Sequence, residues 1–216
     1  MARISVLGGT GYAGGNIVAV AASRGHSVVS FSRKAPEQPV ADVEYRLGDV
    51  RDAAMVAEAV SGADVVVSAL SPRGALEAPG LLRGIEQGVA KLAQQRGVRF
   101  GVVGGAGSLL VADAGPKVVD TEGFPDAFKS EAAEMAGVLD DLRAADECLD
   151  WFFVSPAGGF GAWAPGDATG QYRLGGDVLL ADDNGESNIS GADLALALVH
   201  EIETPAHHRA RFTVAY

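Results

Sequence analysis

Three glycines near the N-terminus have the spacing of a phosphate-binding turn. Gly8, Gly11 and Gly14 form a GxxGxxG pattern between an apolar, strand-forming stretch and a stretch of small, helix-forming residues. Such glycines allow a tight turn, close approach of the backbone to a pyrophosphate, and close packing of the helix on the strand. The free N–H groups at the start of the helix then bind the phosphates. The pattern predicts a dinucleotide-binding turn rather than an ordinary glycine turn.

Two basic residues follow the second predicted strand, residues 26–32. Arg33 and Lys34 come directly after it, and no Asp or Glu lies between Gly25 and Pro36. An acidic residue at this place binds the ribose hydroxyls of NADH, whereas an arginine accommodates the 2′-phosphate of NADPH. We therefore expect NADPH to be preferred, with Arg33 as the first candidate and Lys34 as the second. The alternative is that both are solvated loop charges.

Asp49 and Val50 follow a third predicted strand, residues 43–47. Asp49 can cap the helix predicted over residues 52–60, because aspartate accepts hydrogen bonds from the free N–H groups of a first helical turn. It can also accept a bond from the adenine amino group while Val50 packs on the ring. The two interpretations are compatible.

Ser108 and Lys129 are candidates for the reacting end of the cofactor. Ser108 follows a glycine-rich stretch after the strand predicted over residues 99–103, and glycines there let the backbone approach a flat ligand. Ser108 either meets the cofactor or caps a turn. Lys129 begins a helix predicted to reach about Cys148, where the helix dipole disfavours a cation. It either binds the nicotinamide ribose or is simply solvated.

The region after the strand predicted over residues 150–155 has a different composition. The chain turns outward at Pro156, and residues 159–188 are rich in Gly, Asp and aromatic residues, with a short hairpin expected around residues 171–180. Loops beyond strand ends carry variable chemistry, so we expect a substrate cover here. Its aromatic residues either stack on a planar substrate or fill a small satellite core: Phe160, Trp163 and Tyr172.

The predicted elements alternate between strand and helix along the chain. The apolar run at residues 64–69 is typical of a strand buried on both faces of a parallel sheet. The alternation predicts an α/β, Rossmann-type doubly wound fold, mainly parallel, with helices on both faces. Right-handed crossovers bring the loops after the strands to one edge. We expect one NAD(P)-binding domain over residues 1–216: a core over 1–155, cover loops over 156–189, and a closing helix and strand over 190–216, with Ser190 and Asp193 as its capping box.

The composition argues against several classes of protein. A net charge of −11 disfavours binding to nucleic-acid phosphates. No apolar run approaches the ~20 residues of a membrane span and no leader pattern is present, so we expect a cytoplasmic protein without membrane association. The four histidines lack metal-ligand spacing, so no metal is expected, and His207 and His208 fit a solvated loop. Cys148 is expected in the core rather than as a nucleophile.

Motifs along nearly the whole chain resemble the atypical short-chain dehydrogenase/reductases, the NAD(P)-binding group that includes the NmrA-like proteins. Within that group the chain is most similar to the bacterial NADH-flavin reductase-like proteins, which are similar to biliverdin reductase B. The motifs are VLGGTGYAGG near the start, GDV at Gly48, VVGGAGSL at Val102, VDTEGFPDAFK at Val119, VSPAG at Val154, YRLGGDVLL at Tyr172, NGESNIS at Asn184 and RFTVAY at the end.

The resemblance implies an NADPH-dependent oxidoreductase that transfers hydride to a small planar substrate such as a flavin or a quinone. We expect a monomer or a homodimer. Carried over by position, the cofactor contacts would be Gly8, Thr10, Gly11, Tyr12 and Ala13 at the pyrophosphate, Arg33 at the 2′-phosphate, Asp49 and Val50 at the adenine, Ala69 and Leu70 at the adjoining ribose, and Gly104 and Pro156 at the nicotinamide.

Two departures from the family leave the proton donor unassigned. No tyrosine is followed by lysine four residues later, so the YxxxK pair is absent, which argues against alcohol oxidation. The histidine that follows the nicotinamide-binding proline in biliverdin reductase B aligns with Ala157 or Gly158. For a flavin, solvent can supply the proton, because positioning provides much of the rate. Two other functions stay open: a non-catalytic NAD(P)H-sensing regulatory protein of NmrA-like type, and a sugar-nucleotide epimerase or dehydratase.

Overall fold

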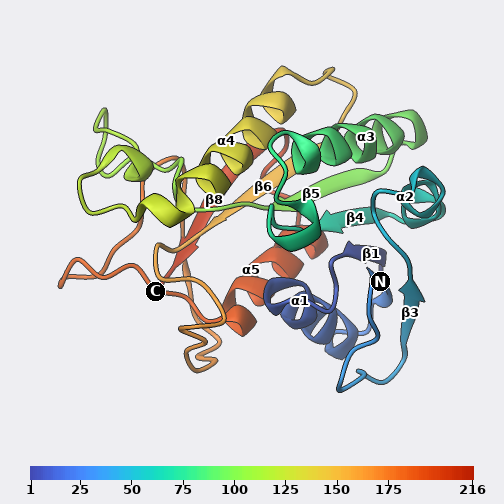
Figure 1. Cartoon of the computed structure of the whole chain (residues 1–216). Helices are drawn as coiled ribbons and strands as arrows, with labels where there is room; N and C mark the ends of the chain where they lie inside the picture. The colour runs from blue at the N-terminus through green and yellow to red at the C-terminus, as the bar shows by residue number, and fades with distance from the viewer.

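The computed structural model describes residues 1–216, in which eight strands form one sheet (Figure 1). The strands are β1 (Arg3–Leu7), β2 (Ser27–Ser32), β3 (Val43–Leu47), β4 (Val65–Ser68), β5 (Arg99–Val103), β6 (Trp151–Pro156), β7 (Arg173–Gly175) and β8 (Ala210–Ala215). Their order is β3-β2-β1-β4-β5-β6-β8-β7, and every neighbouring pair is parallel except β7 with β8. The predicted doubly wound, mainly parallel Rossmann-type fold is confirmed.

Five helices cover the two faces of this sheet. They are α1 (Tyr12–Ser23), α2 (Ala53–Val60), α3 (Leu81–Arg96), α4 (Lys129–Ala144) and α5 (Gly191–Glu203). Helices α1 and α5 pack together on one face, whereas α2, α3 and α4 lie on the other (Figure 1). As predicted, Ser190 caps α5, since its Oγ accepts a 3.0 Å bond from the Asp193 N–H.

Strand β6 divides its aromatic side chains between the two cores. Trp151 and Phe153 belong to the core under α2, α3 and α4, whereas Phe152 belongs to the core under α1 and α5. This division follows from the period of two, which sends successive side chains of a strand to opposite faces. A Cβ at Gly101 on β5 would collide with the Phe152 ring, so this glycine makes room for the aromatic side chain.

The strand order places a topological switch point between β1 and β4. The chain winds outward from β1 through β2 to β3, and then from β4 through β5 and β6 in the opposite direction. In open α/β sheets, ligands bind in the crevice beyond the carboxyl ends of the strands at such a point. We call the side where the parallel strands end the carboxyl edge, and the side where they begin the amino edge.

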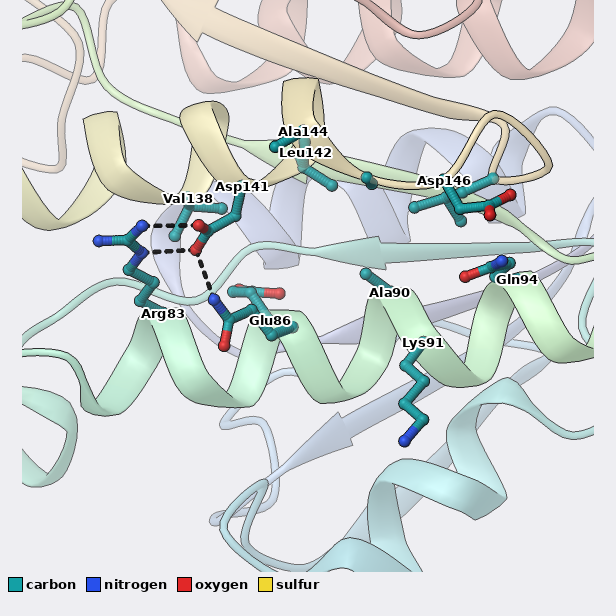
Figure 2. Close-up of a pocket in the computed structure, with 13 residues that line it drawn as sticks. Arg83, Glu86, Ala90, Lys91, Gln94, Val138, Asp141, Leu142, Ala144 and Asp146 are labelled. Atoms are coloured by element: carbon teal, nitrogen blue, oxygen red, sulfur yellow. Dashed lines mark hydrogen bonds and ion pairs between the residues drawn. The ribbon is translucent and has the colours of Figure 1, made fainter.

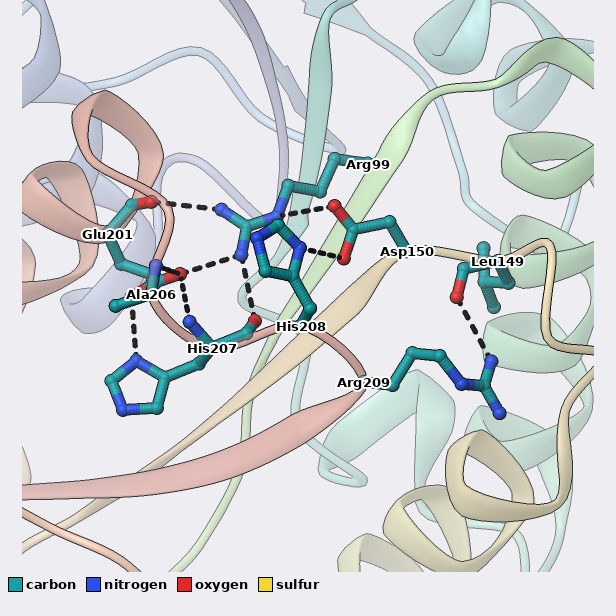
Figure 3. Close-up of polar contacts among 8 residues, drawn as sticks. All are labelled: Arg99, Leu149, Asp150, Glu201, Ala206, His207, His208 and Arg209. Atoms are coloured by element: carbon teal, nitrogen blue, oxygen red, sulfur yellow. Dashed lines mark hydrogen bonds and ion pairs between the residues drawn. The ribbon is translucent and has the colours of Figure 1, made fainter.

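The amino edge holds a cluster of buried charges (Figure 3). Arg99, the first residue of β5, is 8% exposed, and its guanidinium donates to the Glu201 carboxylate at 2.6 Å and to the Glu201 carbonyl at 2.9 Å. Its Nε lies 3.2 Å from Asp150 Oδ2. Burial would raise the pKa of Glu201, but hydrogen bonds from Arg99 and His207 outweigh it and lower that pKa. The His207 ring also stacks on Phe212 at 4.3 Å, so the prediction of a solvated loop was wrong for His207.

The predicted hairpin around residues 171–180 is not formed. Residues Arg173–Gly175 instead pair antiparallel with β8, at the far end of the chain, and Val178 bridges to Leu110. The short strand finds its partner outside its own neighbourhood because β8 otherwise has an open side. Local sequence cannot reveal that partner.

Cys148 lies outside the core, contrary to expectation. Helix α4 ends at Ala144, and the exposed Cys148 sits in the turn that follows, where its backbone N–H donates to Asp146 Oδ1 at 2.8 Å. The Asp146 carboxylate raises the pKa of the Cys148 thiol. The thiol therefore stays protonated near neutral pH, which makes it a poor nucleophile.

No helix of the protein combines the length and apolar character that a membrane span requires.

Candidate cofactor site

The glycine-rich turn after β1 follows a backbone path that side chains would block. Gly8 has φ +79°, in the left-handed region that favours glycine, and its carbonyl accepts a 3.0 Å bond from the Gly11 N–H. A Cβ at Gly14 would collide with the Gly8 carbonyl oxygen, and a Cβ at Gly9 would collide with the Ser30 hydroxyl. The helix therefore packs on the strand at a distance that only glycine permits.

Four backbone donors of this turn are left without acceptors. The backbone N–H groups of Thr10, Tyr12, Ala13 and Gly14 donate no hydrogen bond within the protein, and Gly11 caps α1 without a side-chain bond. No acidic residue occupies the first turn of α1. The partial positive charge of the helix N-terminus is therefore unopposed. These residues, together with the glycine path, fit a dinucleotide pyrophosphate.

Ala69 and Leu70 border the turn from the neighbouring strand, at the switch point. A Cβ built on Gly8 would lie 3.0 Å from the Ala69 carbonyl oxygen and 3.2 Å from Leu70 Cδ2. The Ala69 N–H donates to the Leu7 carbonyl at 2.9 Å, which continues the β1–β4 pairing past the end of the strands. The structure thus brings these two predicted residues against the glycine turn.

Arg33 stands free at the end of β2. It is exposed, and its guanidinium makes no hydrogen bond or ion pair with the protein. Its charge contributes to the low pKa of Asp49, which is about 2, chiefly because of hydrogen bonds from Arg51. Arg51 is a second exposed cation in this region that sequence reasoning missed. Its position two residues after Asp49, in the loop that follows β3, was the available signal.

Asp49 does not cap helix α2. Asp52 does so, since its Oδ1 accepts from the Ala54 N–H at 2.9 Å. Asp49 instead accepts bonds from the Arg51 N–H at 2.9 Å and from the Arg51 Nη2 at 2.6 Å. Val50 is buried. The capping alternative was wrong, and contact of Asp49 and Val50 with adenine stays a prediction.

Gly104 follows the last residue of β5, and Pro156 is the last residue of the neighbouring strand β6. A Cβ at Gly104 would collide with the Phe153 ring, so packing alone requires glycine there. The adjacent Gly105 has open space where a Cβ would be, and Pro156 is buried. Packing of the core therefore explains the glycine at position 104. The position with open space beside the backbone is Gly105. Contact of Gly104 and Pro156 with the nicotinamide stays a prediction.

Ser108 and Lys129 are both engaged within the protein. The Ser108 Oγ accepts a 2.9 Å bond from Arg211 Nη1, and no backbone N–H donates to it, so it does not cap a turn. Lys129 is exposed, and its Nζ lies 2.6 Å from Asp126 Oδ1. The ion pair offsets the unfavourable helix dipole. Catalytic roles for the two residues stay predictions.

The three aromatic residues of the cover have different environments. Phe160 packs on the ring of Tyr12 with centroids 5.3 Å apart, and the Tyr172 hydroxyl lies 2.7 Å from His200 Nδ1. Both border the core under α1 and α5, which is one of the two main cores and not the small satellite core of the alternative prediction. Trp163 is 62% exposed and stacks on Phe128, so that alternative was wrong for Trp163 as well.

Tyr12 ties the glycine turn to the cover. Its hydroxyl donates to the Pro165 carbonyl at 3.1 Å and accepts from the Gly191 N–H at 3.0 Å, at the start of α5. The buried Asp193 carboxylate forms a second link to the cover, because it accepts hydrogen bonds from Thr169 and also from the Tyr216 hydroxyl. Burial would raise the pKa of Asp193, but these bonds lower it. The cover is therefore anchored on both sides of the α5 N-terminus.

A separate groove of about 230 Å³ lies between α3 and α4 (Figure 2). Glu86 on α3 lines it, although the residue is only 2% exposed. Its Oε1 accepts a 2.5 Å bond from the Ser68 hydroxyl at the end of β4, and its Oε2 has no partner. Burial raises the pKa of Glu86 to about 7. No three His, Cys, Asp or Glu side chains anywhere in the chain are grouped to hold a metal ion.

Comparison with known proteins places this geometry in a family. A family model described as NAD(P)H-binding matches residues 8–205. The Bacillus subtilis protein YwnB is 36% identical over 98% of this chain and 97% of its own length. A Streptococcus pneumoniae structure described as a "putative NADH-flavin reductase" is 32% identical, with a TM-score of 0.84, over 100% of this chain and 99% of that one.

A Bacteroides thetaiotaomicron structure described as a "putative epimerase" is 30% identical, with a TM-score of 0.87, over 100% of this chain and 97% of that one. The match of the family model begins at Gly8, the first glycine of the turn, and includes all four free N–H groups. The chain therefore belongs to the NAD(P)H-binding family.

Proposed function

We propose that this protein is an NADPH-dependent oxidoreductase that transfers hydride to a flavin or a similar planar, conjugated acceptor. The observation that carries the proposal is the set of four free backbone N–H groups at the switch point, in a chain of the NAD(P)H-binding family. The similarity to the Streptococcus pneumoniae protein supports a flavin as the acceptor.

The preference for NADPH rests on Arg33. Its guanidinium is exposed and has no protein partner, and no carboxylate occupies the end of β2 to receive ribose hydroxyls. Arginine presents a planar fork of donors that matches a phosphate group in a bidentate manner. Arg51 is nearby, but Asp49 already neutralises it. Arg33 is thus the side chain best able to discriminate the 2′-phosphate.

The chain contributes position rather than acid–base chemistry. When bound, the dinucleotide supplies a hydride, and the acceptor gains this hydride together with one proton from solvent. The N–H groups of the turn would hold the pyrophosphate, and Gly104 with Pro156 would border the nicotinamide. Ala157 and Gly158 carry no group able to donate a proton. A flavin tolerates this, since orientation of donor and acceptor supplies much of the rate.

A second function fits the same observation about the proton donor. A regulatory protein that binds NAD(P)H without turnover needs the glycine turn and the cover, but no proton donor beside Pro156. In that case the anchored cover, which joins Tyr12 to the start of α5, would present the cofactor-bound state to a protein partner.

Titration of the protein with NADPH and NADH tests the cofactor, and rapid mixing of the NADPH complex with FMN tests the reaction. We expect NADPH to bind at least about tenfold more tightly, and its absorbance to decay on mixing. Arg33→Ala should weaken NADPH binding about tenfold or more and leave NADH binding unchanged, because it removes one charge-assisted phosphate contact.

Lys34→Ala is the matched control and should have a smaller effect on NADPH binding. Equal affinity for the two cofactors in the unmodified protein would overturn the NADPH preference. Tight NADPH binding with no oxidation by FMN, riboflavin or quinones would favour the regulatory function.

A further inference from the structure

Three side chains from separate loops form a cluster that we call the aromatic lip: Arg73, Phe128 and Trp163. The rings of Phe128 and Trp163 stack with centroids 6.2 Å apart and planes 14° apart. The Arg73 guanidinium carbon lies 5.8 Å from the Phe128 centroid and 6.0 Å from the Trp163 centroid. Both distances are within the range of cation–π attraction.

The lip lies on loops that follow three neighbouring strands at the carboxyl edge. Arg73 comes three residues after Leu70, which borders the glycine turn. Trp163 lies in the loop after β6, beyond Pro156, and packs over Gly161. Phe128 lies at the end of the long connection after β5, directly before α4. The strands β4, β5 and β6 are adjacent in the sheet, so the three loops lie on the side of the switch point where the nicotinamide is predicted to bind.

Both rings of the lip are partly exposed to solvent. Trp163 is 62% exposed and Phe128 is 42% exposed, and they are two of the few large apolar side chains on the surface. Single exposed apolar residues are ordinary, but two stacked rings with an arginine against both are a preformed platform for a flat ligand. The packing of Trp163 over Gly161 fixes the platform from below.

Arg73 keeps its anion-binding fork free. Its Nε donates to Glu131 Oε2 at 2.7 Å, while its two terminal nitrogens make no hydrogen bond within the protein. Those nitrogens are the pair that binds a carboxylate or phosphate in a bidentate manner. The nearby Lys129 is already paired with Asp126. In a chain of net charge −11, an anionic ligand needs such a local cation.

We propose that the aromatic lip selects the acceptor: a flat aromatic ring system that carries an acidic group. The ring stacks on the Phe128–Trp163 pair, and the phosphate or carboxylate binds the terminal nitrogens of Arg73. The proposal rests on the proposed function and narrows its acceptor from any planar molecule to an anionic one.

FMN and riboflavin provide the test, because they share one ring system and differ by a phosphate. At saturating NADPH, we expect the KM for FMN to be about tenfold lower than the KM for riboflavin, because FMN gains one charge-assisted contact with Arg73. Arg73→Met should bring the two KM values within about twofold of each other. Trp163→Leu should raise both KM values together, since stacking serves the shared ring.

Two further variants serve as controls. Arg143 lies in the last turn of α4, at the opposite end of this helix from the lip, and it is likewise exposed and paired with one carboxylate, that of Asp177. Arg143→Met should therefore preserve the FMN preference. Glu131→Gln removes the only competitor for Arg73 and should lower the KM for FMN severalfold without changing that for riboflavin.

Calorimetric titration of the NADP⁺-saturated protein with FMN and riboflavin separates the two proposals. If FMN binds through Arg73 but no acceptor oxidises NADPH, the proposed oxidoreductase function fails and the lip stands as an anion-selective site. If both flavins are reduced with equal KM, or if Arg73→Met keeps the preference for FMN, the inference about the lip is overturned while the oxidoreductase function stands.

Discussion

The two edges of the sheet use arginine in opposite ways. At the amino edge, Arg99 is buried, its terminal nitrogens donate to Glu201 and to the His207 carbonyl, and its Nε lies 3.2 Å from Asp150 Oδ2. At the carboxyl edge, Arg33 has no protein partner, and Arg73 uses only its Nε. A buried charge must be paired and hydrogen-bonded, because desolvation is costly. An exposed one keeps donors that a ligand can take over. Donor occupancy, rather than residue type, separates the structural edge from the binding edge.

The largest expected effect on stability comes from removing a partner of Arg99 at the amino edge. Glu201→Ala removes the nearer and more buried of the two carboxylates that face the Arg99 guanidinium, and the free energy of unfolding should fall by about 3–5 kcal/mol. Urea unfolding measures the loss, and NADPH affinity of the folded protein should stay unchanged. Arg24→Ala removes only the exposed partner of Glu203, which keeps its contact with His26, and should cost at most about 1 kcal/mol. Equal losses from the two variants would contradict the comparison.

The carboxyl edge also holds a buried carboxyl group whose protonation changes with folding, that of Glu86, which is bonded to Ser68. Because burial raises its pKa from 4.5 to about 7, folding favours the protonated form. The contribution of Glu86 to the free energy of unfolding is fully present below about pH 4.5, falls as the pH rises to about 7, and stays reduced above. The difference is about 3 kcal/mol.

Glu86→Gln should abolish this fall, since the amide oxygen still accepts from Ser68. Urea unfolding of both proteins at pH 5 and pH 8 measures it. Parallel pH dependence in the two proteins would mean that Glu86 is ionised throughout that range.

At the carboxyl edge, a side chain added to the glycine turn should weaken cofactor binding. Gly14→Ala places a methyl group against the Gly8 carbonyl, which displaces α1 and its free N–H groups, and NADPH affinity should fall about 100-fold. Gly84→Ala is the matched control, because a Cβ there meets open space inside α3. It should leave binding unchanged and stabilise the fold by up to about 1 kcal/mol. Unaltered NADPH binding by Gly14→Ala would disprove the role of the turn.

The sheet and the glycine turn were predictable because their signals are local. The apolar run around Val65–Ser68 and the glycine spacing each lie within a few neighbouring residues. Two nearby aspartates, Asp49 and Asp52, were equally good capping residues by type, so sequence could not choose between them. The partners of Trp163 and of strand β7 come from distant parts of the chain. Only the tertiary fold brings such segments together, and the aromatic lip was missed for this reason.

The antiparallel strand β7 has a consequence for self-association. A long, flat outer strand offers unpaired N–H and C=O groups to another chain and invites aggregation. Here β7, with three residues, forms one border of the sheet, and β3, with charged Glu44 and Arg46, forms the other. Neither border offers a long apolar strand on which a second copy could extend the sheet. The shortness of β7 and the charges of β3 therefore disfavour extension of the sheet by a second copy.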